Sequence, residues 1–247
     1  MLIQVVRRTA HILGLEVTRS SSYLSDLSPA ERRIVHRARP YTQTSLDRIA
    51  ALIKAVDYVV HNRIPGAFVE CGVWKGGSSM AAALAFMEFG AEDIDFFLFD
   101  TFAGMPAPGE KDVQARTGRS ASEMLANSLK WSEVKAYASI EEARRNIEST
   151  GYPAGKLHFV PGMVEETIPK RAPEQIAILR LDTDWYSSTK HELVHLYPRL
   201  SRDGVLIIDD YGHWKGAKEA VDEYFAQKPP RPLLNRIDYS GRVSVKL

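Results

Sequence analysis

The chain has 247 residues, of which 45% are hydrophobic and 26% are charged, and its formal net charge is +1. These values are ordinary for a globular domain, and the near-zero charge gives no electrostatic reason to expect a nucleic acid or a membrane surface as a partner. The single cysteine, Cys71, excludes an intrachain disulfide framework and fits a reducing cytoplasm, where we expect the protein. No apolar run approaches the roughly 20 residues that span a bilayer, so we expect no integral membrane association.

The N-terminal stretch 1–15 mixes apolar residues with Arg7 and Arg8 and lacks the unbroken apolar core of a signal peptide. It predicts an amphipathic helix that rests on the protein body or on a second subunit. A peripheral membrane anchor is the alternative, with only two arginines in its favour. We expect residues 1–45 to form a helical cap segment in front of one domain at 46–247, and the protein to be a homodimer or a higher homo-oligomer.

A helix is predicted at 46–61, where apolar residues recur at helical spacing after the possible N-caps Thr44 and Ser45. A strand is predicted at 67–71, and the turn at 72–77 that follows contains three glycines. Glycines let a ligand approach the backbone closely, and the start of the next helix offers free N–H groups to an anion such as a carboxylate. The turn therefore predicts a ligand-binding loop. A purely structural turn is the alternative, because the spacing is not that of a dinucleotide-binding fingerprint.

A second strand is predicted at 96–99 and ends in Asp100. An acid at this position can accept hydrogen bonds from a ribose diol, and a helix cap or a surface acid is the alternative. The chain from Pro106 to Ser122 is polar and rich in proline and glycine. Loops of this length are usually functional or disordered, and we expect an insertion near 104–123 to form a lid over a substrate.

Three aspartates follow the ends of two further apolar runs. Asp182 follows the run 176–181, and Asp209 and Asp210 follow the run 205–208. Short β-branched runs predict strands buried in a parallel sheet, and ligands bind outside the carboxyl ends of such strands. Three carboxylates that converge there would repel one another without a cation, and hard oxygen ligands suit Mg²⁺, Mn²⁺ or Ca²⁺. The aspartates therefore predict a divalent-metal site.

The order of the elements predicts the fold. The remaining predicted elements are a strand at 157–160, helices at 190–202 and 215–227, and strand-like runs at 233–239 and 242–246. The last two runs are joined only by Ser240-Gly241, which permits only an antiparallel hairpin. Alternating strands and helices predict an α/β doubly wound sheet. A mostly parallel seven-stranded sheet with a C-terminal antiparallel hairpin and helices on both faces is the Rossmann-like class I methyltransferase fold, whereas nicotinamide-binding domains usually stay parallel throughout.

His191, Glu192 and His195 spell the H-E-x-x-H pattern of zinc peptidases. In such enzymes the two histidines share one helical face and the glutamate is a general base. Here the pattern lies along a crossover helix, and no obvious third ligand follows in a metzincin-like extension. We therefore expect an ordinary amphipathic helix.

Four residues near the aspartates are predicted to bind a substrate. Asp184, Trp185 and Tyr186 follow Asp182 closely, and His213 follows the aspartate pair. Trp185 could equally be a core residue, and a lone loop histidine is usually only solvated. Their position next to the predicted metal site favours a place in the substrate pocket.

Taken together, five segments resemble the macrocin O-methyltransferase family, the metal-dependent sugar methyltransferases of macrolide and aminocoumarin pathways. The resemblance runs from about Tyr41 to the C-terminus, and the set of segments is much more specific than any one of them. The N-terminus and the 106–122 loop depart from the antibiotic-pathway members, so their acceptor sugars are not carried over. The segments are Tyr41–Ser45, Val69–Gly77, Leu98–Phe102, Leu179–Asp184 and Ile207–Tyr211.

The resemblance implies that Asp182, Asp209 and Asp210 hold Mg²⁺ or Mn²⁺ and that Asp182 is also the catalytic base. It also implies that residues of the glycine turn and of the second strand contact S-adenosylmethionine. With the neighbouring positions, the predicted cofactor-binding residues are Thr42, Thr44, Glu70, Gly72, Val73, Ser78, Asp100, Thr101, Phe102, Gly162 and Val164.

These inferences predict an S-adenosylmethionine- and Mg²⁺-dependent O-methyltransferase that acts on a glycoside. Two adjacent hydroxyls could chelate the metal together, so we expect the acceptor to be a vicinal diol on the sugar of a natural product or a surface glycan. Two alternatives stay open beside the zinc peptidase. One is a catechol-type O-methyltransferase, which uses the same metal chemistry on an aromatic diol. The other is a catalytically silent S-adenosylmethionine-binding or oligomer-forming module.

Overall fold

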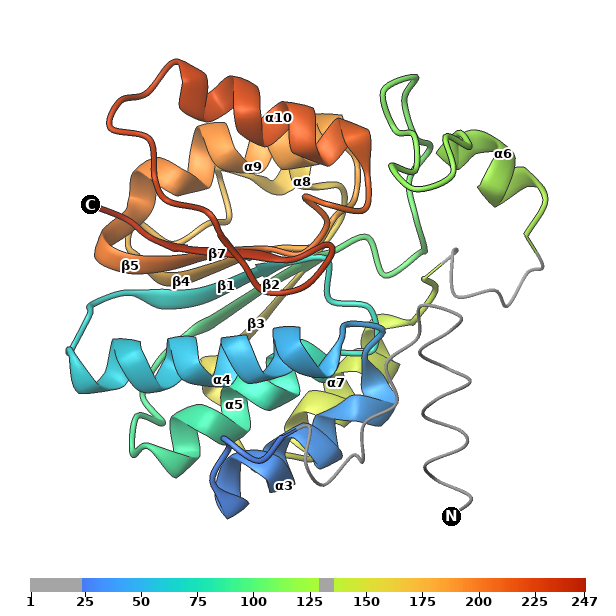
Figure 1. The fold of residues 1–247 in the computed structure, drawn as a ribbon. Coiled ribbons are helices and arrows are strands. Elements are labelled where there is room, and N and C mark those ends of the chain that lie inside the picture. Colours follow the sequence, from blue (N-terminus) through green and yellow to red (C-terminus); the bar gives the residue numbers. More distant parts are fainter. Residues whose placement is uncertain (1–23, 129–135) are drawn as a thin grey trace, which may run out of the picture.

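The computed structural model describes residues 24–128 and 136–247, and a seven-stranded sheet runs through the middle of them (Figure 1). The strand order is β3-β2-β1-β4-β5-β7-β6. The first five strands are parallel, and β7 runs antiparallel to both β5 and β6, which confirms the predicted fold class. The strands are β1 (Ala67–Cys71), β2 (Phe96–Asp100), β3 (Leu157–Pro161), β4 (Ile176–Leu181), β5 (Leu200–Ile208), β6 (Asn235–Arg236) and β7 (Arg242–Val245).

Helices cover both faces of this sheet, and the short helix α6 lies apart at its edge (Figure 1). One face carries α3 (Pro29–Ala38), α4 (Leu46–His61), α5 (Gly77–Glu88) and α7 (Ile140–Glu148). The other face carries α8 (Val164–Thr167), α9 (Tyr186–Leu196) and α10 (Lys215–Ala226). The remaining elements are α6 (Ala121–Ala126) and the 3₁₀ turns η1 (Arg39–Tyr41), η3 (Ala154–Lys156) and η4 (Tyr197–Arg199).

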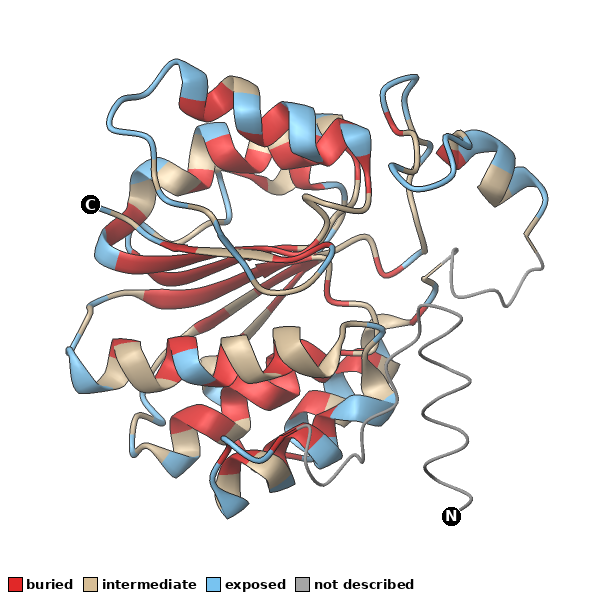
Figure 2. Ribbon diagram, viewed as in Figure 1, coloured by how far each residue is buried: buried red, intermediate tan, exposed pale blue. Residues whose placement is uncertain are grey.

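Alternate side chains of each strand face the two helix layers. In β1, Phe68 packs with residues of α4 and α5, while Val69 packs with residues of α9 and α10. In β4, Ile178 and Leu179 divide between the same two clusters. Figure 2 shows the result, with strands buried along their length and helices buried on the sides that face the sheet. Strands buried on both faces appear in a sequence as nearly continuous apolar runs, interrupted here only by Glu70 in β1 and Arg180 in β4, and both strands have the predicted bounds.

The described part of the predicted N-terminal cap segment packs into the same core. Leu27 and Val35 are buried in the cluster that includes α4 and α5. Ser45, rather than Thr44, caps α4 by accepting a hydrogen bond from the Arg48 N–H at 3.2 Å. The predicted helix at 1–15 lies outside the described residues, and the domain boundary at residue 45 stays a prediction. Within residues 24–128 and 136–247, no helix is long and apolar enough to cross a membrane.

Three predicted elements differ most in their bounds from the structure. The helix predicted at 190–202 instead spans Tyr186–Leu196, because the hydroxyl side chains that resembled a loop form its first turn and a 3₁₀ turn that contains Pro198 follows it. Strand β5 starts at Leu200, five residues before the run that predicted it. The run predicted at 233–239 contributes only the two residues of β6.

Candidate active site

A cavity of about 370 Å³ opens where β1, β2, β4 and β5 end, a volume in the range of small-molecule sites. Every predicted cofactor-binding residue lines it except Phe102, and so do the three predicted metal ligands. Three of the four predicted substrate-binding residues also line it, and Tyr186 does not. The sequence therefore located most of the cavity wall.

The two exceptions have other roles in the fold. Phe102 is buried with its ring 6.3 Å from the ring of Phe159, so it belongs to the core. Tyr186 begins α9 and is half-buried. Its hydroxyl donates to Glu223 at 2.7 Å, and the Lys111 ammonium lies 3.8 Å from the ring centre. Neither side chain lines the cavity, and the predicted binding roles of Phe102 and Tyr186 stay predictions.

The glycine turn between β1 and α5 requires glycine at its first position. Gly72 has φ +88°, and a Cβ there would lie 2.0 Å from the Asp182 carbonyl oxygen. Glycine therefore lets the turn pass directly against the loop after β4. Helix α5 then begins at Gly77, and the side of its first turn that carries Ser78 lines the cavity. The turn thus brings a helix N-terminus, which attracts anions, into the same cavity as the aspartates.

Asp100 holds this turn in place. Its Oδ2 accepts hydrogen bonds from the N–H groups of Val73 and Trp74 at 2.7 and 2.8 Å, and its Oδ1 accepts one from the Phe102 N–H at 2.7 Å. A carboxylate with three backbone donors fixes the loops after β1 and β2 relative to each other. Its predicted contact with a ribose diol stays a prediction.

Arg180 is the central residue that sequence reasoning missed. It is 2% exposed on β4, and its guanidinium donates to three carboxylates: Glu70 at 2.7 Å, Asp182 at 2.6 Å and Asp209 at 2.5 Å. These bonds satisfy the charges that the fold buries at the ends of β1, β4 and β5. The signal in the sequence was a single charge inside an otherwise apolar strand.

A second arginine, Arg48 on α4, binds the other side of Asp209. It donates to the Asp209 carboxylate and also to Asp238 at 3.0 Å, in the turn between β6 and β7. Thr44 adds a hydrogen bond to Asp209 at 3.2 Å. Asp209 is 3% exposed, and hydrogen-bond donors from α4, from β4 and from the loop before α4 surround its carboxylate.

A different trio of carboxylates gathers beside this arginine network, and Asp182 belongs to both. One oxygen each of Asp182, Asp184 and Asp210 lies within 4.8 Å of the other two. Burial raises the pKa of each of them, and the neighbouring carboxylates raise it further, to about 7 for Asp184. The Oδ2 atom of Asp210 is buried with no hydrogen-bond partner among the described residues. Of the predicted metal ligands, Asp182 and Asp210 belong to this cluster, while Asp209 faces the arginines and its metal role stays a prediction.

Asp184 reaches the cluster through an unusual backbone conformation. Its φ is +68°, a left-handed value that non-glycine residues adopt at a cost and that is common at functional sites. The next residue, Trp185, is 2% exposed, with its ring 5.0 Å from the ring of Trp214 and its Nε1–H donating to the Pro106 carbonyl at 3.1 Å. Trp185 is therefore both a core residue and part of the cavity wall.

The predicted lid is ordered against the ends of α9 and α10. Its Ala115 N–H donates to the His213 carbonyl, and its Val113 carbonyl accepts from the Lys215 N–H. Asp112 is 1% exposed, and its carboxylate accepts from the Tyr186 N–H at the start of α9 at 2.8 Å. Residues on both sides of this segment line the cavity, and its role as a lid stays a prediction.

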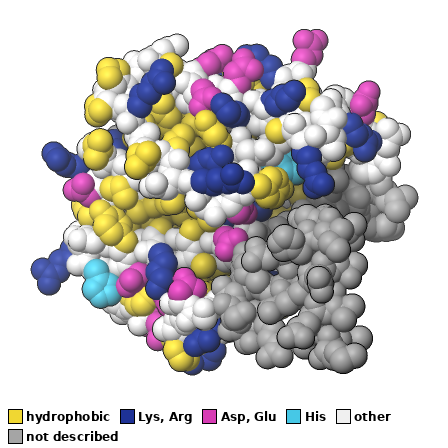
Figure 3. All heavy atoms as spheres, in the orientation of Figure 1, with side chains coloured by type: hydrophobic (Ala, Val, Ile, Leu, Met, Phe, Trp, Pro, Cys, Tyr) yellow, Lys and Arg dark blue, Asp and Glu magenta, His cyan; other side chains and the backbone are white. Residues whose placement is uncertain are grey.

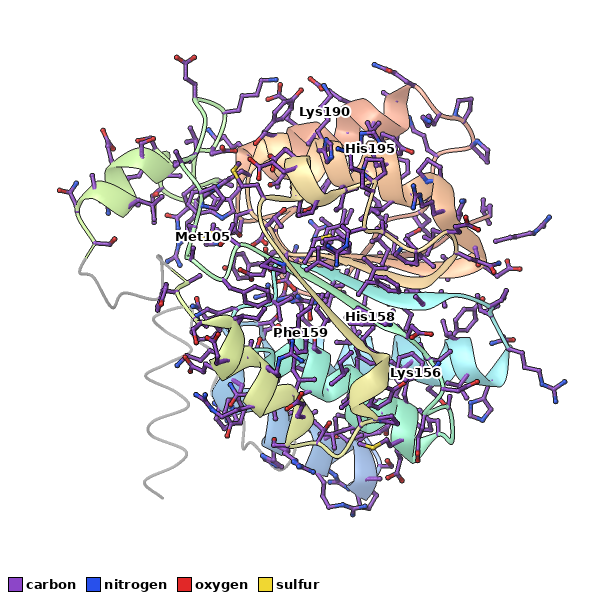
Figure 4. All side chains as sticks on the ribbon, turned by 180° about the vertical axis from the view of Figure 1, so that it is seen from behind. Met105, Lys156, His158, Phe159, Lys190 and His195 are labelled. Carbon is purple, nitrogen blue, oxygen red and sulfur yellow. The ribbon has the colours of Figure 1, made fainter. Side chains whose placement is uncertain are left out.

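The H-E-x-x-H pattern does not form a peptidase site. The rings of His191 and His195 lie 4.4 Å apart, and His191 Nε2 is 3.1 Å from the Ile168 carbonyl oxygen. Glu192 is fully buried against the sheet, where it accepts a hydrogen bond from Thr183. In Figure 4, His195 lies on α9 well away from the cavity residue Met105. The glutamate and the histidines thus point in different directions, as an amphipathic helix requires.

The surface in Figure 3 carries acidic, basic and apolar side chains side by side. No single-sign field dominates this view, in line with the net charge of +1. The absence of a nucleic acid partner and the oligomeric state stay predictions.

The strand order, the glycine turn followed by an acid at the end of β2, and the acid-lined cavity define a class I S-adenosylmethionine-dependent methyltransferase. Residues 16–244 match the family model described as Macrocin-O-methyltransferase (TylF). The chain belongs to the macrocin O-methyltransferase family, as the resemblance predicted, and it is an O-methyltransferase that uses S-adenosylmethionine.

Curated and solved relatives agree with this assignment. Demethyldecarbamoylnovobiocin O-methyltransferase from Streptomyces niveus is 33% identical over 204 residues, 83% of this chain and 75% of that protein. Mycinamicin III 3''-O-methyltransferase from Micromonospora griseorubida is 32% identical over 185 residues, 74% of this chain and 70% of that protein. The structure of the O-methyltransferase NovP matches with a TM-score of 0.73 at 31% identity, covering 83% of this chain and 82% of that one.

Proposed function

We propose that this enzyme transfers the methyl group of S-adenosylmethionine to one hydroxyl of a vicinal diol on a glycosyl group, with Mg²⁺ or Mn²⁺ bound at its carboxylates. The observation that carries the proposal is the meeting of a carboxylate cluster and a cofactor turn in one cavity. The names of the relatives support a glycoside acceptor, because they specify demethyldecarbamoylnovobiocin and mycinamicin III.

The residues present fit a divalent cation. Asp182, Asp184 and Asp210 crowd their oxygens together, and the unpartnered Oδ2 of Asp210 is a buried atom that needs a positive partner. Oxygen ligands of this kind select Mg²⁺ or Mn²⁺ over softer ions. We assign Asp182 and Asp210 to the metal, and the third carboxylate is either Asp184, by the observed cluster, or Asp209, by the family resemblance.

A bound divalent cation would lower the pKa of an acceptor hydroxyl and fix its direction. The side chains and backbone of the site would supply cofactor binding and proton transfer. The start of α5 would bind the carboxylate of the methionine part of the cofactor. Arg180 holds Oδ2 of Asp182 and so orients this carboxylate, whose side chain is 28% exposed in the cavity. Asp182 would accept the hydroxyl proton as the oxygen attacks the methyl carbon and the sulfonium leaves as a thioether. Positioning of donor and acceptor is the main contribution of the protein.

The diol can be tested with demethyldecarbamoylnovobiocin and analogues that each lack one sugar hydroxyl. Removing the hydroxyl next to the methylated one should lower kcat/KM by about 10²-fold, because the pair is needed to chelate the metal and to orient the nucleophile. Removing a more distant hydroxyl should cost less than tenfold. Equal rates for the parent diol and the analogue that lacks the neighbouring hydroxyl would exclude chelation by the pair.

A further inference from the structure

His213 joins three separate elements at the mouth of the cavity. It follows β5, and its Nε2 lies 3.2 Å from the Gln114 Nε2 of the lid. Its Nδ1 lies 2.8 Å from the hydroxyl oxygen of Tyr239, in the turn between β6 and β7. All three residues line the cavity. Both nitrogens of the imidazole are therefore engaged, which leaves His213 poorly suited to bind an acceptor directly or to act as a base.

Hydrogen bonds within the lid indicate which nitrogen of His213 carries the proton. Thr117 accepts a hydrogen bond from the Arg119 N–H at 3.3 Å, and its own hydroxyl donates to the Gln114 Oε1 at 2.6 Å. The Gln114 amide nitrogen is then turned toward His213, and an amide nitrogen only donates. With the amide in this orientation His213 Nε2 accepts, so the imidazole carries its proton on Nδ1 and donates it to the Tyr239 oxygen.

This direction leaves the Tyr239 hydroxyl with a proton and no acceptor for it among the described residues. The side chain is 55% exposed at the cavity, which it lines together with Asp182 and Asp210. A phenol that already accepts a hydrogen bond is a stronger donor, because chains of hydrogen bonds polarise one another.

We propose that Tyr239 is a specificity-determining residue that donates a hydrogen bond to an oxygen of the acceptor sugar. The lid fixes the direction of the hydrogen bonds that free the Tyr239 proton for this role, through Gln114 and His213. The proposal rests on the proposed sugar acceptor. The arrangement couples recognition of the acceptor to the position of the lid, because Gln114 belongs to the lid and contacts His213 only when the lid lies against the cavity. His213 is a positioning residue in this arrangement.

The first test needs no ligand. Long-range ¹⁵N–¹H NMR distinguishes the two neutral tautomers of a histidine, and the His213→Gln variant identifies the His213 signals among the seven histidines. We expect Nδ1–H in the native protein at pH 9, where the imidazole is neutral. In Gln114→Glu the carboxylate can only accept, so the proton should move to Nε2. An Nε2–H tautomer in the native protein, or an unchanged tautomer in Gln114→Glu, would overturn the proposal.

The second test measures kcat/KM with demethyldecarbamoylnovobiocin as the acceptor probe. Tyr239→Phe should lower it by about three- to tenfold, the scale of one hydrogen bond, with an unchanged affinity for S-adenosylmethionine. Gln114→Glu should lower it to the same level, because Tyr239 then donates to His213 instead, and the double variant should lose no more. Tyr211→Phe is the matched control, since that hydroxyl binds Asp222 at 2.7 Å, outside the cavity wall.

Failure of the proposed role of Tyr239 can be distinguished from failure of the proposed sugar acceptor. A native enzyme that methylates the probe while Tyr239→Phe retains full kcat/KM would contradict the role of Tyr239 and leave the sugar acceptor in place. A native enzyme that methylates no glycoside would contradict the proposed function, and the tautomer measurement would still decide the polarity set by the lid.

Discussion

Replacing Arg180 by methionine should lower the free energy of unfolding by about 3–5 kcal/mol, because it removes one partner of a buried ion-pair network. The guanidinium is 2% exposed and binds Glu70, Asp182 and Asp209, so its loss leaves buried carboxylates without their shared cation. Urea denaturation followed by circular dichroism measures the change.

The matched control for Arg180 is Lys218→Met, which breaks an exposed ion pair with Asp222 on α10. Pairs of this kind contribute about 0–1 kcal/mol. Adding Glu70→Gln to Arg180→Met should recover part of the lost stability, because it removes one of the stranded charges. An Arg180→Met protein within about 1 kcal/mol of the native protein would contradict the central role of this arginine.

Replacing Asp182 by asparagine should lower kcat by about 10³-fold, within the range expected for loss of a general base. Asparagine keeps the shape of the side chain but can neither take the hydroxyl proton nor supply a charge to a cation. The affinity for S-adenosylmethionine, measured by calorimetry, should change little. Retention of more than a tenth of the native kcat would contradict both roles of Asp182.

Two further variants identify the third carboxylate of the metal site. Asp184→Asn removes the third member of the observed cluster, and Asp209→Asn removes the member implied by the family resemblance. The variant that raises the Mg²⁺ concentration needed for half-maximal activity identifies the ligand. Since Arg48 and Arg180 bind Asp209, the Asp209→Asn protein also needs a stability measurement beside the activity assay.

The sequence was sufficient to locate the walls of the site because its strands are buried on both faces. Mostly apolar runs marked the bounds of β1 and β4, and the residues at the carboxyl ends of parallel strands lie at the same edge of the sheet. That rule alone brought Gly72, Asp100 and Asp182 together. The family motifs then extended the wall to Thr42 and Thr44 before α4.

Side-chain direction at that edge could not be predicted in the same way. Asp209 and Asp210 are adjacent and past the regular strand, so the choice between the arginines and the carboxylate cluster depends on tertiary contacts. Arg48 comes from α4, far away in the sequence, and Asp184 turns inward only through its left-handed backbone. No pattern in the sequence carries these facts.

The lid and the C-terminal turn were the other limits of prediction. The 106–122 loop has no apolar periodicity, and its order comes from contacts such as the one between Asp112 and the start of α9. Tyr239 lies in a run that resembled a strand, and only the fold brings it next to His213 and Gln114. The residues that we propose to contact the acceptor are thus the ones whose positions the sequence predicts least well.

The most direct test of a metal-dependent glycoside O-methyltransferase is mass spectrometry of the products formed with trideuteromethyl S-adenosylmethionine. The acceptors are demethyldecarbamoylnovobiocin, mycinamicin III and a simple catechol, each tried after chelation and after addition of Mg²⁺. We predict a labelled methyl group on a sugar hydroxyl of at least one glycoside, absent after chelation and restored by Mg²⁺. Labelling of the catechol alone, or full glycoside labelling after exhaustive chelation, would contradict the proposed function.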